Sequence, residues 1–372
     1  MKNNITKNAN LIVIKIGSSL LIGSDEKINS PWLESLIADI ALLKKQGKKI
    51  IIVTSGAVAI GRDKILNGKN RPLRLEEKQA AAACGQLNLM DSYRKLLKKY
   101  NIETAQILLT IDDTEDRRRY LNAEDTIFTL LNVGIIPIIN ENDSVATAEL
   151  RFGDNDRLAA RVAQMMCADT LILLSDIDGL YDKNPSKYTN AKHIPIVKKI
   201  DNKIENMGEG AASTTGSGGM ITKIAAAKIA ASAGCHTIIS SGKINNPIKF
   251  LNEGAKYTIF QSDKTPASAK KQWIAHNLKT KGIIQIDAGA VNALRNGKSL
   301  LPAGVIKVSG DFVRGEAVSI SDENNNELAR GLIAYSSDDA NLIIGKKTNE
   351  IEKILNFSGR TEMIHRSDMS LT

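Results

Sequence analysis

The stretch that decides the fold is Asn140-Glu141-Asn142-Asp143, followed after a short interval by Gly153-Asp154-Asn155-Asp156. An apolar run leads into the first cluster, and apolar residues at helical spacing follow the second. This pattern predicts a buried strand, a polar loop and a helix capped by Asp154 or Asn155. Carboxylates and side-chain amides would then gather at the edge where open α/β sheets bind ligands. The alternative is an ordinary Asn/Asp turn with an N-cap, but these need only one or two such residues.

The composition narrows the class of protein. A chain of 372 residues is long enough for two or three domains and a large core. The net charge of +9 favours anionic partners such as nucleotides, acidic metabolites or RNA, whereas 4% aromatic residues disfavour a base-stacking surface. The three cysteines form no C-x-x-C, so neither a disulfide framework nor a zinc site is expected. The absence of a signal peptide or a long apolar run predicts a cytoplasmic protein that contacts no membrane.

Strand and helix patterns alternate over residues 1–262, which form the first predicted domain. This alternation predicts an α/β fold: a three-layer αβα sandwich with a mainly parallel central sheet covered on both faces. Strands are expected at 11–16, 49–53, 104–109, 135–140, 170–174 and 237–239, and helices at 31–46, 74–100, 120–131 and 220–233.

The pattern changes after residue 262. Residues 263–280 are predicted to be a linker, and residues 281–361 a small β-rich domain of the usual size for an independent unit. Its strands are expected at 282–286, 304–308, 317–320 and 332–335, with one short helix at 288–295.

Lys15 lies in a strand that is otherwise apolar. A buried lysine is costly unless an anion or a carboxylate meets it, so Lys15 is a candidate ligand for a charged substrate. Gly17 follows and is expected to leave backbone N–H groups open to a phosphate. A solvent-exposed lysine on an edge strand is the alternative.

Two further strand ends carry polar residues. Ser55 precedes a helical stretch, where its hydroxyl and the next amides are candidates for binding a carboxylate. Ser175 and Asp176 end another strand and are candidates for contacts with a ribose or a base. Each segment, taken alone, also fits an ordinary turn.

The glycine-rich segment 214–219 opens a helix that carries Lys223 in its first turn. Glycines let backbone amides approach phosphate oxygens, and the lysine adds a point charge. The segment does not fit the Walker A pattern. A plain flexible loop is the alternative.

These residues suit one kind of chemistry. The histidines and cysteines stand in no motif, so no catalytic histidine or cysteine is indicated. A nucleophile that is already an anion, such as a carboxylate, needs no general base. Phosphoryl transfer to it then requires in-line positioning and neutralisation of the phosphoryl charge, which two lysines and a magnesium ion supply. Asp156 is expected to hold the lysines through ion pairs.

These segments, in this order and spacing, resemble the amino-acid kinase family. The segments are 13–19, 53–59, 140–145, 153–156 and 216–223. The paired clusters are specific to the branch that phosphorylates L-glutamate, whereas the Lys-x-Gly-Ser start is shared by the wider family. Residues 300–305 and 310–316 resemble the PUA domain that follows the kinase domain in many bacterial members.

The resemblance implies ATP and L-glutamate as substrates and γ-glutamyl phosphate as product, in the first step of proline synthesis. Magnesium would be bound mainly through the ATP phosphates, with no metal ligands from the protein. Proline as feedback inhibitor and a homo-oligomer, either a dimer or a tetramer, are further family expectations. The segment 144–152 would be a mobile loop that such an inhibitor orders.

The resemblance also assigns site residues. The catalytic residues would be Lys15 and Lys223, which stabilise the phosphoryl group, and Asp156, which organises them. Ser55, Asp143 and Asn155 would bind glutamate, with Asp143 facing the free ammonium group. The nucleotide-binding residues would be Lys15, Gly17, Ser175, Asp176, Ser217, Gly218, Gly219, Met220, Ile221, Thr222 and Lys223. Ser217 stands where the family commonly has threonine, and both carry a hydroxyl.

Two alternatives remain open on the sequence. One is a kinase of another small acid or phosphate, such as N-acetylglutamate, aspartate or a nucleoside monophosphate. The other is an RNA-binding protein, because PUA domains occur in RNA-modifying proteins and the chain is basic. RNA binding is the weaker alternative, since aromatic residues are few and no basic arm stands out in residues 281–361.

Overall fold

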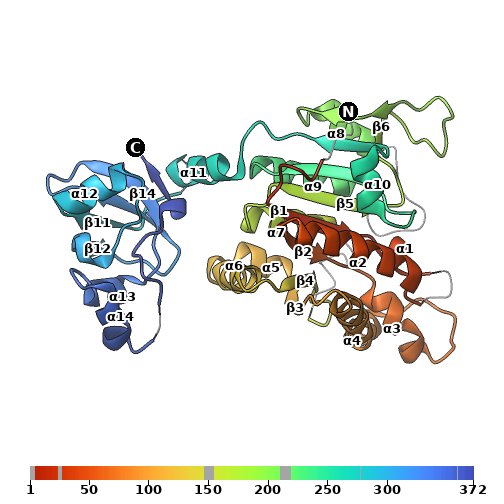
Figure 1. The fold of residues 1–372 in the computed structure, drawn as a ribbon, viewed down its shortest axis with the longest axis horizontal. Helices are drawn as coiled ribbons and strands as arrows, with labels where there is room; N and C mark the ends of the chain where they lie inside the picture. The colour runs from red at the N-terminus through yellow and green to blue at the C-terminus, as the bar shows by residue number, and fades with distance from the viewer. Residues whose placement is uncertain (1–4, 24–26, 146–154, 210–218, 277, 358) are drawn as a thin grey trace. The chain divides into compact units, whose positions relative to one another are not determined.

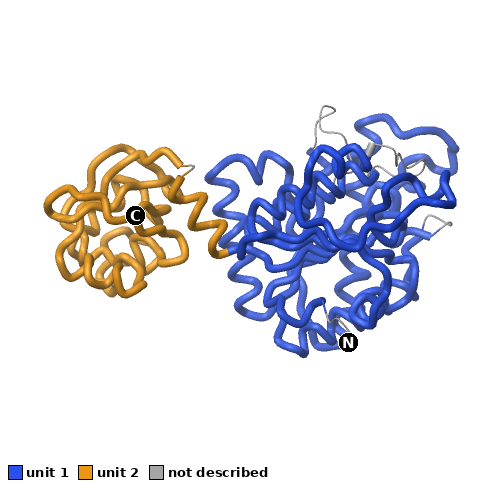
Figure 2. Tube along the Cα trace, turned by 90° about the horizontal axis from the view of Figure 1, so that it is seen from above, with its two compact units in different colours: residues 1–266 blue, residues 267–372 orange. Residues whose placement is uncertain are grey.

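The computed structural model describes the chain except for residues 1–4, 24–26, 146–154, 210–218, 277 and 358. The chain divides into two compact units, residues 1–266 and residues 267–372 (Figure 2). None of the helices in the described parts has both the length and the apolar character needed to cross a membrane.

The first unit is built on one large sheet, whose strands β1 to β5 are labelled in Figure 1. Its strand order is β3-β4-β2-β1-β5-β9-β10-β8. The strands from β3 to β9 are parallel to their neighbours, and β10 is antiparallel to β9. In sheet order the strands are β3 (Thr104–Leu109), β4 (Ile136–Glu141), β2 (Lys49–Val53), β1 (Leu11–Ile16), β5 (Thr170–Ser175), β9 (His236–Ser241), β10 (Tyr257–Phe260) and β8 (Ile196–Val197). A separate hairpin pairs β6 (Leu180–Tyr181) with β7 (His193–Ile194).

Helices cover both faces of this sheet, because its central strands are apolar on both sides. Alternate residues of β1 enter different core layers: Ile12 and Ile14 pack on one face and Val13 on the other. The Ile12 face is covered by α1 (Ser18–Leu21), α2 (Ser30–Lys45), α3 (Ala57–Leu66), α4 (Leu75–Lys98) and α10 (Pro247–Glu253). The Val13 face is covered by α6 (Arg117–Asn132), α7 (Asn155–Met165), α8 (Asn202–Glu209) and α9 (Met220–Ser232), and a short helix α5 (Ile111–Glu115) precedes α6.

The second unit contains a five-stranded sheet in the order β12-β11-β13-β14-β15. Strands β11 and β13 are parallel and the other neighbours are antiparallel. Its elements are α11 (Pro266–His276), β11 (Gly282–Ile286), α12 (Ala288–Arg295), β12 (Val305–Gly310), β13 (Ala317–Ser321), β14 (Glu327–Leu332), α13 (Ser337–Leu342), α14 (Thr348–Leu355) and β15 (Met369–Leu371), with short 3-10 turns at Pro302–Gly304 and Arg366–Asp368.

The predicted three-layer sandwich with an additional β-rich part is confirmed. The predicted strands of the first unit lie within a residue or two of the observed ones, and α6 begins at Arg117 rather than at residue 120. The side chain of Asp116 accepts from the backbone N–H of Arg119 and so caps the helix earlier than its apolar pattern indicates.

Two local predictions about the second unit are wrong. Much of the segment 263–280, expected to be a linker, forms α11, whose Ile274 is fully buried against Ala317 and Leu332. Its two buried side chains, Ala269 and Ile274, are too weak a periodic signal to reveal such a helix. The strand expected at 332–335 lies earlier in the chain: β14 runs from Glu327 to Leu332 and follows a turn in which Asn325 has a positive φ.

Candidate active site

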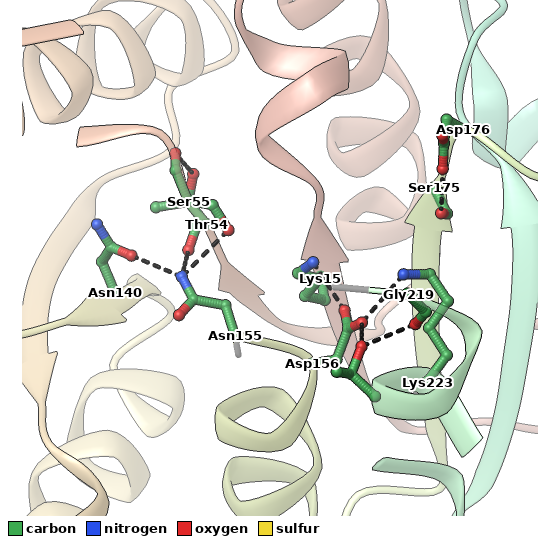
Figure 3. Close-up of polar contacts among 11 residues, drawn as sticks. Lys15, Thr54, Ser55, Asn140, Asn155, Asp156, Ser175, Asp176, Gly219 and Lys223 are labelled. Atoms are coloured by element: carbon green, nitrogen blue, oxygen red, sulfur yellow. Dashed lines mark hydrogen bonds and ion pairs between the residues drawn. The ribbon is translucent and has the colours of Figure 1, made fainter. Parts of the chain in front are cut away.

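The site lies at the carboxyl edge of the large sheet, where β1 stands between β2 and β5. Lys15, near the end of β1, pairs in register with Val53 of β2 and Leu173 of β5. Successive crossovers leave this part of the sheet in opposite directions, which makes it the topological switch point where α/β sheets bind ligands. The ends of β2, β4 and β5 bring Ser55, Asn140 and Ser175 to the same edge (Figure 3).

Asp156 forms ion pairs with two lysines from distant parts of the chain (Figure 3). Its Oδ1 lies 2.7 Å from Nζ of Lys15, and its Oδ2 lies 3.0 Å from Nζ of Lys223. The hydroxyl of Thr222 also donates to Oδ2, at 3.0 Å. The sequence therefore identified three residues that the fold brings into direct contact.

Local structure explains how these three side chains meet. Lys15 lies two residues after Val13, on the sheet face that α7 and α9 cover. Asp156 lies in the first turn of α7, and Lys223 in the first turn of α9. Both helices therefore begin at the carboxyl edge, directly beside the end of β1.

Burial strengthens the electrostatic interactions among these three charged groups. Lys15, Asp156 and Lys223 are 8%, 2% and 5% exposed. Burial by itself would raise the pKa of Asp156, but the charges and hydrogen bonds of Lys15 and Lys223 outweigh it and hold that pKa below its ordinary value. Asp156 is therefore an anion between two cations, and this cluster carries one net positive charge in a poorly solvated place. Such a cluster favours a phosphoryl group that carries negative charge.

A second polar cluster centres on Asn155 (Figure 3). Its amide nitrogen donates to the carbonyl of Thr54 at 2.6 Å, to Oδ1 of Asn140 at 2.9 Å and to Oγ of Ser55 at 3.1 Å. The expectation that Asn155 caps the helix is wrong, because it is already the first residue of α7 and its amide is used across the sheet edge. The other candidate cap, Asp154, lies outside the described residues.

Asp143 follows β4 and is partly buried. Among the described residues no hydrogen bond or ion pair reaches its carboxylate, and burial raises its pKa to about 6. A desolvated carboxylate without a partner favours binding of a cation. The segment 144–152, predicted to be a mobile loop, lies mostly outside the described residues.

Of the predicted nucleotide-binding residues, Ser175 and Asp176 lie on the side of Lys15 and Lys223 that is opposite to Asn155 (Figure 3). The hydroxyl of Ser175 donates to Oδ1 of Asp176 at 3.0 Å, and Asp176 is exposed (Figure 3). Ile221 is 51% exposed, whereas Met220 is buried in the core. Ser217 and Gly218 lie outside the described residues, and Gly219 begins the described part of this segment.

Gly17 differs from its expected role. Its own N–H donates to the carbonyl of Leu174 at 3.3 Å, so this group continues the pairing of β1 with β5 and is not open to a phosphate. The strand pairing, which the local sequence does not reveal, decides this.

Sequence reasoning missed Gln86 of α4, which accepts a hydrogen bond from Asn140 at 2.8 Å. It gave Asn140 no role beyond membership of the first polar cluster, although Asn140 accepts a hydrogen bond from Asn155. Thr222, predicted to contact the nucleotide, also donates its hydroxyl to Asp156. A signal for Gln86 was present: it is a polar residue in the buried stripe of a long helix. The stripe consists of Ala82, Gln86, Leu89, Tyr93 and Leu97.

Comparison with known proteins identifies the families to which the two parts of the chain are similar. Residues 10–241 match the model of the amino acid kinase family, and residues 282–355 match the PUA domain. A glutamate 5-kinase of Paramagnetospirillum magneticum is 52% identical over 362 residues, covering 97% of each chain. A glutamate 5-kinase of Nitrobacter hamburgensis is 53% identical over 359 residues, covering 96% of this chain and 94% of the other.

One solved structure, a carbamate kinase from Giardia lamblia bound to AMP-PNP, covers 69% of this chain and 99% of its own, with a TM-score of 0.50. Its sequence identity is 15%, so this likeness shows the fold of the first unit and nothing about its substrate.

Proposed function

The chain belongs to the amino acid kinase family, and we propose that it transfers the γ-phosphoryl group of ATP to the γ-carboxylate of L-glutamate. The product is L-glutamyl 5-phosphate, which is formed in the first step of proline biosynthesis. The observation that carries this proposal is the pair of buried lysines on Asp156, beside a cluster of carboxylate and amide groups. The full-length likeness to glutamate 5-kinases supports the choice of substrate.

The reaction needs charge stabilisation more than proton transfer. An oxygen of the γ-carboxylate attacks the γ-phosphorus, the bond to the β,γ-bridging oxygen breaks, and ADP leaves with the electron pair. The attacking oxygen is already ionised near neutral pH, so no residue has to remove a proton. Lys15 and Lys223 lie where they neutralise charge on the transferring group.

Asp156 acts as the organiser of the lysines. Without an anion between them, two buried ammonium groups would repel each other and lose solvation. The distances of 2.7 Å to Lys15 and 3.0 Å to Lys223 let one carboxylate fix both. The lysines are therefore held in place before ATP binds, which lowers the cost of reorganisation during the reaction.

Magnesium would be held mainly by the ATP phosphates, where it would supply further neutralisation of the phosphate charge. Both oxygens of Asp156 already contact lysines, so this carboxylate serves the lysines. The nucleotide itself would contact Lys15, Ser175, Asp176 and the start of α9, including the residues from Ser217 to Lys223.

The glutamate end of the site recognises a free amino acid. Asp143 offers a carboxylate to the α-ammonium group, and Ser55 and Asn155 offer further polar contacts. An N-acetylated glutamate has no ammonium group and would leave Asp143 without a counter-charge. This argument favours glutamate over N-acetylglutamate at the same site.

Three further properties follow from the likeness to the family. Proline acts as a feedback inhibitor near the glutamate-binding residues, the protein forms a homo-oligomer, and it works in the cytoplasm. The second unit, with its PUA domain, regulates the enzyme or shapes the oligomer and does not bind RNA. RNA binding that persists across a salt series would overturn that last statement.

Trapping of the acyl phosphate tests the proposed reaction. The protein with ATP, magnesium and hydroxylamine should form a hydroxamate from L-glutamate, with much less product from N-acetylglutamate or aspartate. Release of ADP with a nucleoside monophosphate should stay at background. Preference for any of these other acceptors would overturn the assignment.

A further inference from the structure

The direction of the Asn155 side chain is fixed by a backbone group. The carbonyl oxygen of Thr54 can only accept a hydrogen bond, and the contact at 2.6 Å therefore requires the nitrogen of Asn155 on that side. Thr54 is itself held by the bond from its N–H to the carbonyl of Ile139, at 2.9 Å. The oxygen of the Asn155 amide must then face away from the end of β2.

The orientation of the Asn155 carboxamide determines the orientation of two further buried carboxamides, those of Asn140 and Gln86. The nitrogen of Asn155 also donates to Oδ1 of Asn140, so the nitrogen of Asn140 faces the other way. It donates to Oε1 of Gln86 at 2.8 Å. Gln86, Asn140 and Asn155 are 8%, 1% and 5% exposed, so water cannot readily replace a missing partner.

Gln86 ends the chain in an unusual way. Its Nε2 is buried and has no hydrogen-bond partner among the described residues. A methionine or leucine at this place would pack a side chain of similar size without an unpaired donor. Packing alone therefore does not account for the carboxamide, and its oxygen, which Asn140 uses, is the part with a function.

We propose that Gln86 is a positioning residue for the acceptor substrate: by accepting from Asn140 it keeps Oδ1 of Asn140 turned toward Asn155, and together with the Thr54 carbonyl this holds the Asn155 carboxamide with its oxygen available to the ammonium group of glutamate. The inference rests on the proposed function and adds to it a residue on a different helix. The oxygen of Asn155 and the carboxylate of Asp143 then provide acceptors for a group that has three N–H donors. Gln86 thereby contributes to selectivity for a free amino acid.

Steady-state kinetics of the full-length protein test this role. Gln86→Met removes the acceptor and keeps the length of the side chain, and Gln86→Glu keeps an acceptor oxygen whether or not it is ionised. Asn88→Leu, on an exposed position of the same helix, is the matched control. For Gln86→Met we expect a rise of about tenfold in the glutamate KM, the size expected when one buried hydrogen bond is lost. Its ATP KM and kcat should stay within about twofold.

The variants separate positioning from a structural role. The glutamate KM of Gln86→Glu should lie close to the wild-type value, and that of Asn88→Leu should equal it. An unchanged glutamate KM in Gln86→Met, or equal effects on both KM values, would overturn the inference while the proposed function stands. If Gln86→Met does not fold, a glutamate KM in Gln86→Glu as high as about tenfold above wild type would overturn it equally. A wild-type protein that forms no glutamyl hydroxamate would overturn the proposed function itself.

Discussion

A β-carbon built on Gly85 would lie 1.9 Å from the carbonyl oxygen of Ala57, so α4 and α3 meet backbone to backbone. The contact is reciprocal, because a β-carbon on Gly61 would lie 1.9 Å from the carbonyl oxygen of Ala81. Only glycine permits such an approach. Since α3 begins two residues after Ser55 and Gln86 follows Gly85, this crossing sets the position of the amide chain relative to the end of β2.

Gly85→Ala should therefore destabilise the protein. In most helix interiors this change stabilises by about 1 kcal/mol, but here a backbone oxygen has to move, and overpacking costs about 1–3 kcal/mol. We expect a lower Tm in thermal unfolding and a larger rise in the glutamate KM than in the ATP KM. Ala83→Ser, on the exposed side of α4, should leave both unchanged. A higher Tm for Gly85→Ala would contradict the close contact.

Asp156→Asn should abolish most activity. The change leaves two buried lysines without an anion, and removing one partner of a buried ion pair costs about 3–5 kcal/mol. We expect kcat to fall about a hundredfold or more, since the charges that stabilise the transition state lose their positions. Glu115→Gln, which removes a carboxylate from an exposed pair with Arg161, is the control and should behave as the wild type.

The pH dependence of stability gives a second measure of the same residue. The pKa of Asp156 is lowered in the folded state, so its contribution to stability is present above its ordinary value of 3.8 and is lost as the pH falls through the folded value. Unfolding by denaturant should therefore show a gap between wild type and Asp156→Asn that persists from neutral pH to about pH 4. A gap that closes between neutral pH and that point would argue against the ion pairs.

Lys223→Ala should lower kcat with little effect on glutamate binding. The lysine forms an ion pair with Asp156 and lies apart from the amide cluster that would bind glutamate. Its charge would therefore act mainly on the transferring phosphoryl group. Lys228→Ala removes an exposed lysine of the same helix, paired with Glu205, and serves as the control. Steady-state kinetics with each substrate varied in turn measure the effect, and a defect confined to KM would refute the assigned role.

Glutamate binding should strengthen as the pH rises through about 6. The pKa of Asp143 is raised to about 6 by burial, so its side chain is mostly neutral below this pH and mostly anionic above it. Only the anion attracts the ammonium group, so the glutamate KM should fall about tenfold from about pH 5 to about pH 7, while the ATP KM changes less. The γ-carboxyl of glutamate is mostly ionised over this range.

Asp143→Asn is the control for this titration. Its glutamate KM should be high and nearly independent of pH over the same range, because a carboxamide does not ionise there. A variant that keeps the wild-type pH profile would assign the titration to another group. Asp143→Ala should likewise raise the glutamate KM far more than the ATP KM.

The prediction of the fold succeeded where the signal was a long apolar run. The strands β1, β2 and β5 are continuous stretches of large aliphatic residues, and such runs identify buried strands whatever surrounds them. It failed at α11, which has only two buried side chains, and at the end of β14, whose position depends on one turn. Weak local patterns are overridden by packing, which the sequence does not display.

The candidate site followed the same division. Lys15, Asp156 and Lys223 were identifiable because a charged residue in an apolar strand or at a helix start is conspicuous. Gln86 was not identified, although it is a polar residue in the apolar stripe of its helix, because a glutamine within an alanine-rich helix is common and only its contact with Asn140 shows a role. The N–H of Gly17 was assigned to a phosphate, whereas it pairs with Leu174.

The sequence by itself determined which segments form the sheet and its covering helices, and which residues bring charge to the carboxyl edge. The tertiary structure alone decided that one carboxylate holds both lysines and that three amides share one direction. The physical reason is that hydrogen bonds and ion pairs depend on distance and orientation in space. The partners concerned lie far apart in the chain, as Asp156 and Lys15 do, and only the folded sheet brings them together.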